Sequence, residues 1–370
     1  MTARRAAVVL ALSLAACSGS TRVEGTHRRL SPPDAVDMTA PPDSGEPLLL
    51  ARDQLGPIAL ALDADNVYWI NRGTFESSLK DRFSNGDGSV MKCARKGCGG
   101  RPTALATNRT FQNPEELAFA LDGGYLYWSD WGAELASLVR CAVNGCGMAP
   151  EPVLARLPHA LAAAAERLYA TEYQAEVFTC SAAECESSVT ELWSAGYTPI
   201  ATDISADATG VYWTTVAPAG VLTCPMTGCA NSPSSVMPSK SGLVNTAELA
   251  MDADSVYVVD TNACSRGALA ACKKTGCPEG PTRLAGGLEA PHSIVTDGTH
   301  VYFGEQANPA CGHDEARVGR CAVQGCADSP ETLALGLTAA SAVAVDSEFV
   351  FVADAEAGAV WRLQKAPAAR

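Results

Sequence analysis

Residues 122–128 read Asp-Gly-Gly-Tyr-Leu-Tyr-Trp, and variants of this stretch recur along the chain. In the shared pattern an Asp is followed four residues later by Val or Leu and then by an aromatic residue. The copy that begins at Glu166 is weaker and lacks the Asp. The aromatic residue of the pattern occurs at Tyr68, Tyr127, Tyr169, Tyr212, Tyr257, Tyr302 and Phe351. The steps between these positions run from 42 residues (127 to 169) to 59 residues (68 to 127), so seven similar units follow one another.

Each unit contains four short strand candidates that are separated by turn residues. In the first unit they are residues 57–62, the run around Tyr68, residues 88–93 and residues 102–106. Short alternating runs bounded by turns are typical of antiparallel strands. Four strands per unit, at a period of roughly 45 residues, indicate propeller blades. The sequence therefore predicts an all-β fold, a seven-bladed β-propeller of four-stranded antiparallel blades.

The two ends of the repeat region predict how the ring closes. The last unit stops after residues 358–363, which match the third strand of the other units. The missing fourth strand stands at the beginning, where Pro47-Leu-Leu-Leu-Ala51 resembles Pro102-Thr-Ala-Leu-Ala106. We therefore expect the propeller to span residues 47–365, with its last blade closed by the N-terminal strand. Such closure leaves no free sheet edge between the termini.

Twelve of the fifteen cysteines form six Cys-x4-Cys pairs between the third and fourth strands of blades one to six. The pairs are Cys93/Cys98, Cys141/Cys146, Cys180/Cys185, Cys224/Cys229, Cys272/Cys277 and Cys321/Cys326. A Gly before the second Cys, as in Lys96-Gly97-Cys98, suits a hairpin turn with a positive φ. Two cysteines that flank such a loop can approach within disulfide distance. Zinc ligation by the thiolate pairs is the alternative, and an oxidising compartment favours disulfides.

Two further cysteines, Cys264 and Cys311, follow the aromatic strands of blades five and six by similar distances. Both loops should open on the same side of the ring, so we expect a Cys264–Cys311 disulfide between neighbouring blades. The alternative is a pair of free thiols.

The chain begins with the layout of a lipoprotein signal. A basic start precedes an apolar run over residues 6–16, and small residues stand before Cys17, as in a bacterial lipobox. The run is too short to span a bilayer as a helix. We expect residues 1–16 to be removed as a signal peptide and Cys17 to be lipidated, which would anchor the protein to a membrane. A plain secretory signal with a chance Cys is the alternative.

The segment that follows Cys17 predicts a tether, and the charge of the chain bears on its partners. Residues 17–46 are rich in Ser, Thr, Pro, Gly and Asp and predict a flexible tether. Ser18 favours the outer membrane. The net charge of −14, with no basic cluster beyond residues 92–96, argues against a nucleic-acid partner. We expect a lipid-anchored envelope protein that is a monomer.

One stretch resembles a known repeat family. Leu126-Tyr-Trp-Ser-Asp-Trp-Gly132 looks like the repeat of the YWTD propellers of the low-density lipoprotein receptor family, and Val67-Tyr-Trp-Ile-Asn71 and Val211-Tyr-Trp-Thr-Thr215 are looser copies. The resemblance implies a propeller that binds proteins and carries no active-site chemistry. It also implies six blades, whereas this chain has seven units. The Cys hairpins depart from that family's pattern as well.

Motifs for catalysis are absent from the sequence, which holds no G-x-S-x-G, H-E-x-x-H, P-loop or dinucleotide fingerprint. We therefore expect no catalytic residue, no metal and no cofactor. The alternative is a hydrolase or lyase with a metal in the central channel, held by His159, His292, Glu116 and Asp203. The Asp that opens each unit could bind Ca²⁺, but its recurrence in nearly every blade favours a turn role.

The loops between the second and third strands are the best candidates for function, because long loops on a rigid scaffold often carry it. Their binding candidates are Arg72, Phe75, Asp130, Trp131, Glu172, Tyr173, Asp260 and Glu305. We expect a protein or glycan partner on this loop rim. A purely structural ring, whose loops vary without function, is a further alternative.

Overall fold

The computed structural model describes residues 28–33, 46–74, 86–111, 117–131, 136–172, 176–196, 198–238 and 242–365. Cys17, the signal peptide over residues 1–16 and most of the expected tether lie outside the described residues, as do Phe75, Tyr173 and Glu116. No helix within the described ranges is long and apolar enough to cross a membrane.

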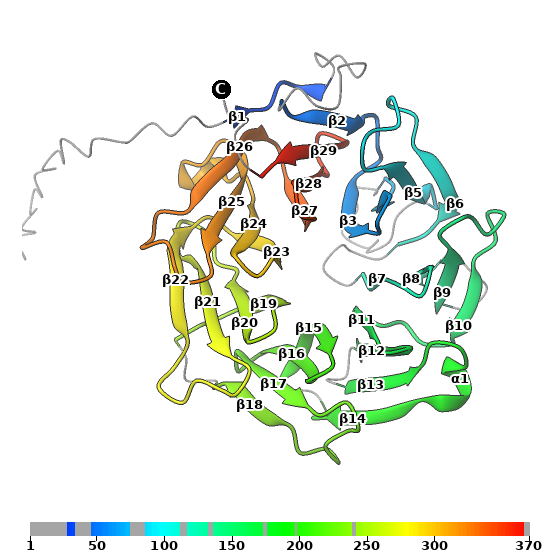
Figure 1. The fold of residues 1–370 in the computed structure, drawn as a ribbon, viewed down its shortest axis with the longest axis vertical. Coiled ribbons are helices and arrows are strands. Elements are labelled where there is room, and N and C mark those ends of the chain that lie inside the picture. The colour runs from blue at the N-terminus through cyan, green and yellow to red at the C-terminus, as the bar shows by residue number, and fades with distance from the viewer. Residues whose placement is uncertain are drawn as a thin grey trace, which may run out of the picture.

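Seven antiparallel four-stranded blades stand in a ring, with the first strand of each blade innermost (Figure 1). Blades one to three comprise β3 (Pro57–Leu62), β4 (Asn66–Asn71), β5 (Gly88–Ala94), β6 (Thr103–Arg109); β7 (Phe119–Asp122), β8 (Tyr125–Asp130), β9 (Ser137–Ala142), β10 (Glu151–Leu154); β11 (Ala160–Ala164), β12 (Arg167–Glu172), β13 (Glu176–Ser181), β14 (Thr190–Ser194). Blades four and five comprise β15 (Ile200–Asp207), β16 (Gly210–Val216), β17 (Gly220–Cys224), β18 (Ser234–Met237); β19 (Thr246–Met251), β20 (Ser255–Asp260), β21 (Gly267–Lys273), β22 (Thr282–Leu288).

Blade six comprises β23 (Pro291–Thr296), β24 (His300–Glu305), β25 (Ala316–Ala322) and β26 (Glu331–Leu337). Blade seven comprises β27 (Ala340–Val345), β28 (Phe349–Asp354), β29 (Ala359–Gln364) and, outermost, β2 (Leu48–Ala51). Two short helices lie in loops, α1 (Cys185–Ser188) and η3 (Pro309–Cys311). The predicted fold class and blade count are confirmed.

The aromatic pattern that repeats in the sequence holds neighbouring blades together. Successive strand residues point to opposite faces of a sheet. Tyr68 therefore packs with Trp128 of blade two, whereas Trp69 packs with Phe351 of blade seven on the other face of β4. Tyr68, Trp69, Trp128 and Phe351 are all 0 % exposed. One Tyr-Trp dipeptide thus fills both interfaces of its blade, which explains why it recurs at blade spacing.

The ring closes as the sequence predicts. β2 pairs antiparallel with β29, with Leu48 opposite Arg362 and Leu49 opposite Trp361. Leu49 and Leu50 are each 1 % exposed. Burial of such a side chain contributes about 1.5–3 kcal/mol, so this short strand binds the beginning of the ring to its end.

A further strand precedes β2 and was not expected from the sequence. β1 (Arg28–Arg29) pairs parallel with the outer edge of β26, and the Leu30 N–H donates to the Leu335 carbonyl oxygen at 2.8 Å. Leu30 is 5 % exposed, and the Arg29 guanidinium forms a two-point ion pair with Glu315. Figure 1 shows β1 on the outside of blade six. This part of the expected tether is therefore docked on the propeller.

All fourteen described cysteines form disulfides. Six bridges close the hairpins between third and fourth strands, and a seventh joins blades five and six, as predicted. They are Cys93–Cys98, Cys141–Cys146, Cys180–Cys185, Cys224–Cys229, Cys272–Cys277, Cys321–Cys326 and, between the two blades, Cys264–Cys311. Gly97, which precedes the second Cys of the first pair, has a φ of 115°.

The second cysteine of a hairpin can also contact the preceding blade, which we did not expect from the sequence. We expected Cys146 and Cys229 only to close their own loops, but in the structure each also contacts the preceding blade. Cys146 packs against the core between blades one and two, and its Sγ lies 3.7 Å from the Leu105 carbonyl oxygen of β6. Cys229 packs against the core between blades three and four, and its Sγ lies 3.6 Å from the Leu192 carbonyl oxygen of β14. Both are only partly buried, since they stand at the hairpin tips.

Backbone hydrogen bonds make the same contact in two later blades. The Cys277 N–H donates to the Val236 carbonyl oxygen, and the Cys326 N–H donates to that of Leu284, both at 3.1 Å. These disulfide hairpins therefore contact the preceding blade as well as closing their own turn. The spacing of the cysteines could not reveal this contact, because the partners lie about 40 residues earlier in the chain.

The Asp that opens each unit caps the turn between the first and second strands. Asp297 Oδ1 accepts hydrogen bonds from the Thr299 and His300 N–H groups at 2.9 Å, and its Oδ2 accepts one from the Tyr302 hydroxyl at 2.8 Å. These bonds, with the Lys365 ammonium, overcome burial and hold the pKa of Asp297 well below its ordinary value. Equivalent backbone bonds occur at Asp63, Asp252 and Asp346, so the turn role is shown for this residue.

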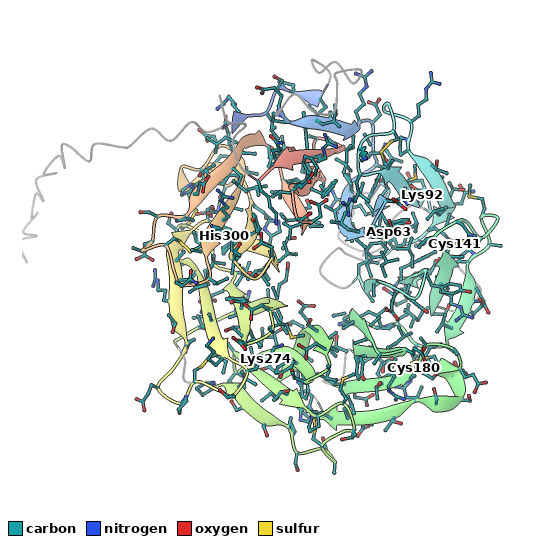
Figure 2. The ribbon with its side chains drawn as sticks, in the orientation of Figure 1. Asp63, Lys92, Cys141, Cys180, Lys274 and His300 are labelled. Carbon is teal, nitrogen blue, oxygen red and sulfur yellow. A yellow bond between two sulfur atoms is a disulfide. The ribbon has the colours of Figure 1, made fainter. Side chains whose placement is uncertain are left out.

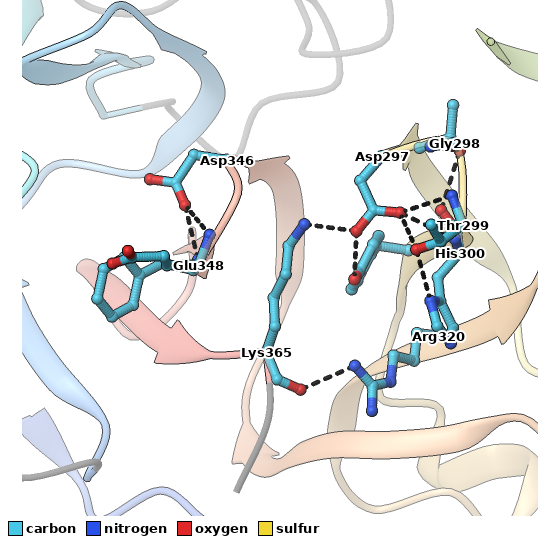
Figure 3. Close-up of polar contacts among 11 residues, drawn as sticks. Asp297, Gly298, Thr299, His300, Arg320, Asp346, Glu348 and Lys365 are labelled. Carbon is cyan, nitrogen blue, oxygen red and sulfur yellow. Dashed lines mark hydrogen bonds and ion pairs between the residues drawn. The ribbon is translucent and has the colours of Figure 1, made fainter. Parts of the chain in front are cut away.

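Cationic side chains cross several seams, a seam being the contact between consecutive blades. Figure 3 shows seam six/seven, where Lys365 Nζ lies 2.5 Å from Asp297 Oδ2 and Arg320 Nη1 donates to the Lys365 carbonyl oxygen at 2.8 Å. Lys92 and Lys274, labelled in Figure 2, cross seams one/two and four/five. The same two sequence positions, one before and two after the first Cys of a hairpin, supply these cations, with Leu363 standing in the place of that Cys in blade seven.

Candidate functional site

The propeller has two faces, which differ in their connections. The turn face carries the hairpins between first and second strands and the disulfide hairpins. The loop rim carries the loops between second and third strands and the loops that lead from a fourth strand into the next blade. Each binding candidate that the structure describes belongs to the loop rim.

Three of these candidates are buried and are part of the scaffold. Asp130, Asp260 and Glu305 are 0 %, 5 % and 2 % exposed. Our expectation that they line an accessible rim is therefore wrong. The physical reason is that the third residue after the aromatic position ends the second strand beneath the loop that enters the same blade.

The carboxylate three residues after the aromatic position accepts hydrogen bonds from backbone N–H groups in three of the blades. Asp260 Oδ1 accepts the Asn245 N–H at 2.8 Å, and Glu305 Oε1 accepts the Glu289 N–H at 2.7 Å. Asp354, at the same position in blade seven, accepts the Ala339 N–H at 2.9 Å. Each carboxylate thereby satisfies backbone donors of the loop that leads into its own blade. Asp130 instead lies 3.1 Å from the Arg109 guanidinium Nε, which reaches it from blade one.

The remaining described candidates are half-buried. The Arg72 guanidinium forms a 2.9 Å ion pair with Glu356 of blade seven, and the Trp131 N–H donates to the Thr110 carbonyl oxygen at 3.0 Å. Glu172 forms a 3.1 Å ion pair with Arg156. Burial raises the pKa of Glu172 more than Arg156 lowers it. These three residues are partly exposed to solvent.

The inter-blade disulfide organises the loops of blades five and six. Glu289, 2 % exposed, accepts the Cys264 and Ser265 N–H groups at 2.9 and 2.8 Å and the Asn308 amide at 2.8 Å. Burial acts to raise its pKa, but these hydrogen bonds outweigh burial and lower it. One buried carboxylate and one disulfide thus fix this part of the rim.

Exposed apolar residues mark a part of the rim that the sequence did not single out. Among the described residues four large hydrophobic side chains are exposed, and three of them, Leu55 at 45 %, Ile200 at 37 % and Val244 at 69 %, lie on the loop rim. Ile200 is the first residue of β15 in blade four, and Val244 lies two residues before β19 in blade five. The Thr202 hydroxyl joins these two inner strands by donating to the Thr246 carbonyl oxygen at 3.1 Å. We call Ile200 and Val244 the apolar rim patch.

Sequence reasoning missed the patch because an apolar residue at a strand entry predicts burial. Val244 lies between Leu243 and Asn245 in a Ser/Gly-containing loop, and only that loop context hinted at exposure. Met148, 49 % exposed, is the one such residue on the described part of the turn face.

The inner strands carry the residues that we considered for channel chemistry. Asp203 Oδ2 accepts the Leu249 N–H at 2.8 Å, and Glu248 Oε2 accepts the Ile294 N–H at 3.2 Å, each from the next blade. Burial, reinforced by the nearby Glu248 carboxylate, raises the pKa of Asp203 to about 7. These carboxylates are engaged as links between inner strands.

Each of the two inner histidines contacts a backbone carbonyl oxygen. The His159 N–H donates to the Thr171 carbonyl oxygen at 2.9 Å, and His292 Nδ1 lies 3.2 Å from the Ala290 carbonyl oxygen. Within the described ranges no three His, Cys, Asp or Glu side chains gather as a metal site would require.

Comparison with known proteins places the fold but no family. No protein-family model matches the chain, and no curated protein matches it. The WD40 β-propeller domain of Doa1 is similar in structure, with a TM-score of 0.59 at 11 % identity over 86 % of this chain and 95 % of that one. The Pan2 WD40 domain of Neurospora crassa has a TM-score of 0.57 at 10 % identity over 89 % of this chain and 97 % of that one.

A structure of the nidogen/laminin complex is also similar, with a TM-score of 0.46 at 14 % identity over 69 % of this chain and 97 % of that one. At that score the likeness carries no argument about repeat type. The chain is therefore a β-propeller, and these likenesses show its fold alone.

Proposed function

We propose that this protein is a non-catalytic binding module whose loop rim engages a protein partner, with the apolar rim patch at the centre of the contact. The carrying observation is the 69 % exposure of Val244 and the 37 % exposure of Ile200, at the entries to the inner strands of neighbouring blades, on a face that the Cys264–Cys311 disulfide and buried carboxylates hold together. Exposed apolar side chains on a rigid face typify interaction sites. Propellers such as the WD40 domains similar to this chain are a scaffold on which protein binding is common.

A role without catalysis accords with the use of the inner polar groups. One oxygen of Asp203 and one of Glu248 each accept a backbone N–H of the next blade, and the other Asp203 oxygen accepts the Ile204 N–H. A glycan would be expected to meet exposed rings and open polar groups, whereas the exposed groups that we find at the patch are aliphatic. We therefore favour a protein over a glycan.

We further propose that the protein is anchored in the cell envelope by lipid on Cys17. Ten residues separate Cys17 from β1, and so the anchor would lie at most about 40 Å from the outer edge of blade six. Metabolic labelling with a fatty-acid analogue, compared between the parent and Cys17→Ser, tests this step. Loss of label and release from the membrane support it, and unchanged membrane attachment of Cys17→Ser contradicts it.

The binding proposal is tested by affinity capture of the detergent-extracted full-length protein from its own envelope. The variant Ile200→Glu/Val244→Glu places two charges in the apolar rim patch, and Met148→Glu is the matched control on the turn face. We expect a partner that the parent and Met148→Glu retain and the double variant loses. A partner retained by all three proteins would refute the patch as the contact.

A further inference from the structure

One seam differs from the others on the turn face. From the residues one before and two after the first Cys of a hairpin, or after Leu363 that stands in its place in blade seven, side chains cross six of the seven seams: cations at four/five, six/seven, seven/one, one/two and two/three, and Tyr169 on Met226 at three/four. Seam five/six is bridged instead farther out, where Arg283 Nε lies 3.5 Å from Asp328 Oδ1. At seam five/six the corresponding residues are Ala271 and Val323. Neither can cross the seam with a charge, because the first is a methyl group and the second an isopropyl group.

A notch of about 540 Å³ opens where these cations are missing. Its walls include Asp252, Tyr257 and Leu284 from blade five, and Gly298 and Val323 from blade six. The notch therefore lies at the position that a Lys ammonium occupies in both neighbouring seams.

Asp252, in the wall of the notch, is equivalent to Asp297, which binds Lys365 at seam six/seven. Asp252 Oδ1 accepts the Asp254 and Ser255 N–H groups at 2.8 Å, and its Oδ2 accepts the Tyr257 hydroxyl at 2.5 Å. Asp297 has the same three partners and in addition Lys365, whose ammonium lies 4.9 Å from the centre of the Tyr302 ring. At seam four/five the Lys274 ammonium likewise lies 5.4 Å from the Tyr212 ring centre. The carboxylate and ring are present at seam five/six, and the cation is not.

We propose that the notch at seam five/six binds a primary ammonium group from outside the chain, the group that a lysine side chain of a partner protein carries. The ammonium would take the place of Lys365 Nζ, between the Asp252 carboxylate and the face of Tyr257. Charge-assisted hydrogen bonding and the attraction of a cation to an aromatic ring both favour this group. The apolar wall at Leu284 and Val323 suits the methylene chain of a lysine.

A neighbouring lysine of the chain is the rival occupant. Lys273 also lines the notch, but its side chain is 65 % exposed and its ammonium lies 4.0 Å from Asp254. Its charge contributes to lowering the pKa of Asp252, but the ion pair that it forms is with Asp254.

The test titrates the full-length protein with Nα-acetyl-lysine methylamide and follows the methyl NMR signals of Val323 and Leu284. The norleucine analogue, which has the same aliphatic chain without the charge, is the matched probe. We expect saturable shifts with the lysine probe and none with norleucine. Equal shifts with both probes, or none with either, would overturn the proposal. Spermidine forms a further arm, and tighter binding of spermidine than of the lysine probe would assign the site to a free polyamine.

Substitutions then place the site. Asp252→Asn should weaken lysine binding about tenfold or more, because it removes the charge while keeping an oxygen for the turn. Asp297→Asn makes the same change at a seam that is already filled and should leave binding unchanged. Val323→Lys supplies the missing cation, so we expect it to abolish binding and raise Tm. If Val323→Lys still binds the probe, or if binding appears only in Lys273→Ala, the proposal fails.

Discussion

At the scale of single residues, a polar residue at the end of the second strand is compatible with two roles, an accessible loop residue or a buried hydrogen-bond acceptor, and the sequence alone does not distinguish them. A polar residue three places after the aromatic position predicts a strand end near solvent, and this prediction put Asp130, Asp260 and Glu305 on an accessible surface. In the structure they face backbone N–H groups or a buried guanidinium. The partners come from a preceding loop or blade, more than ten residues away, so no local pattern reveals them.

Removal of one such carboxylate should destabilise the fold. Asp260→Ala removes a charged acceptor of the part-buried bond from the Asn245 N–H, which costs about 2 kcal/mol. Denaturant unfolding at equilibrium measures the change, and Asp260→Asn should lose less because an amide oxygen remains. A loss below about 0.5 kcal/mol for Asp260→Ala would mean that solvent reaches the site.

The carboxyl of Asp203 should make stability depend on pH. Its pKa of about 7 in the folded protein exceeds the ordinary value of 3.8, so between these values the folded state binds more protons than the unfolded state. The free energy of unfolding therefore falls as pH rises from about 4 to 7. Asp203→Asn mimics the protonated form and should gain stability relative to the parent at pH 8 compared with pH 4. A difference between the two proteins that is independent of pH would contradict this assignment.

At the scale of elements, the blades, the Cys hairpins and the strand that closes the ring could be predicted because each repeats or completes a repeat. Pro47-Leu-Leu-Leu-Ala51 was recognisable as a displaced fourth strand from its likeness to residues 102–106. β1 was not, since two arginines and one leucine carry no strand periodicity. The apolar rim patch escaped prediction as well, because whether Val244 is covered depends on the three-dimensional arrangement of the loops.

The hairpin disulfides should each contribute a similar amount to the free energy of unfolding. Replacing Cys272 and Cys277 by Ser opens a six-residue loop, which the chain-entropy model values at about 2 kcal/mol. Thermal unfolding under non-reducing conditions, compared with the same change at Cys93 and Cys98, checks this value. No loss at either pair would show that the hairpin tips hold their place without the bond.

At the scale of the whole molecule, the ring depends on a strand that is distant in sequence. Deleting residues 1–51 removes β1 with Leu30 and β2 with the buried Leu48, Leu49 and Leu50, a loss of about 7 kcal/mol that is comparable with the stability of an ordinary domain. Deleting residues 1–45 removes β1 but keeps β2, and it should cost about 2 kcal/mol, the burial of Leu30. Circular dichroism melts distinguish the two. Equal stability of both truncations would contradict closure by β2.

The two faces of the ring differ in the features that they carry. Cation-linked hairpins and disulfides hold the blades on the turn face, and the loop rim presents the exposed apolar residues. We propose that a partner binds on the loop rim.

Site-specific photo-crosslinking in intact cells tests this claim most directly, with a photoreactive amino acid at position 244 and, as the control, at position 148. We predict a discrete crosslinked protein from position 244 and none from position 148. Crosslinks from position 148 alone, or from neither position in cells that contain the full envelope, would contradict a partner on the loop rim.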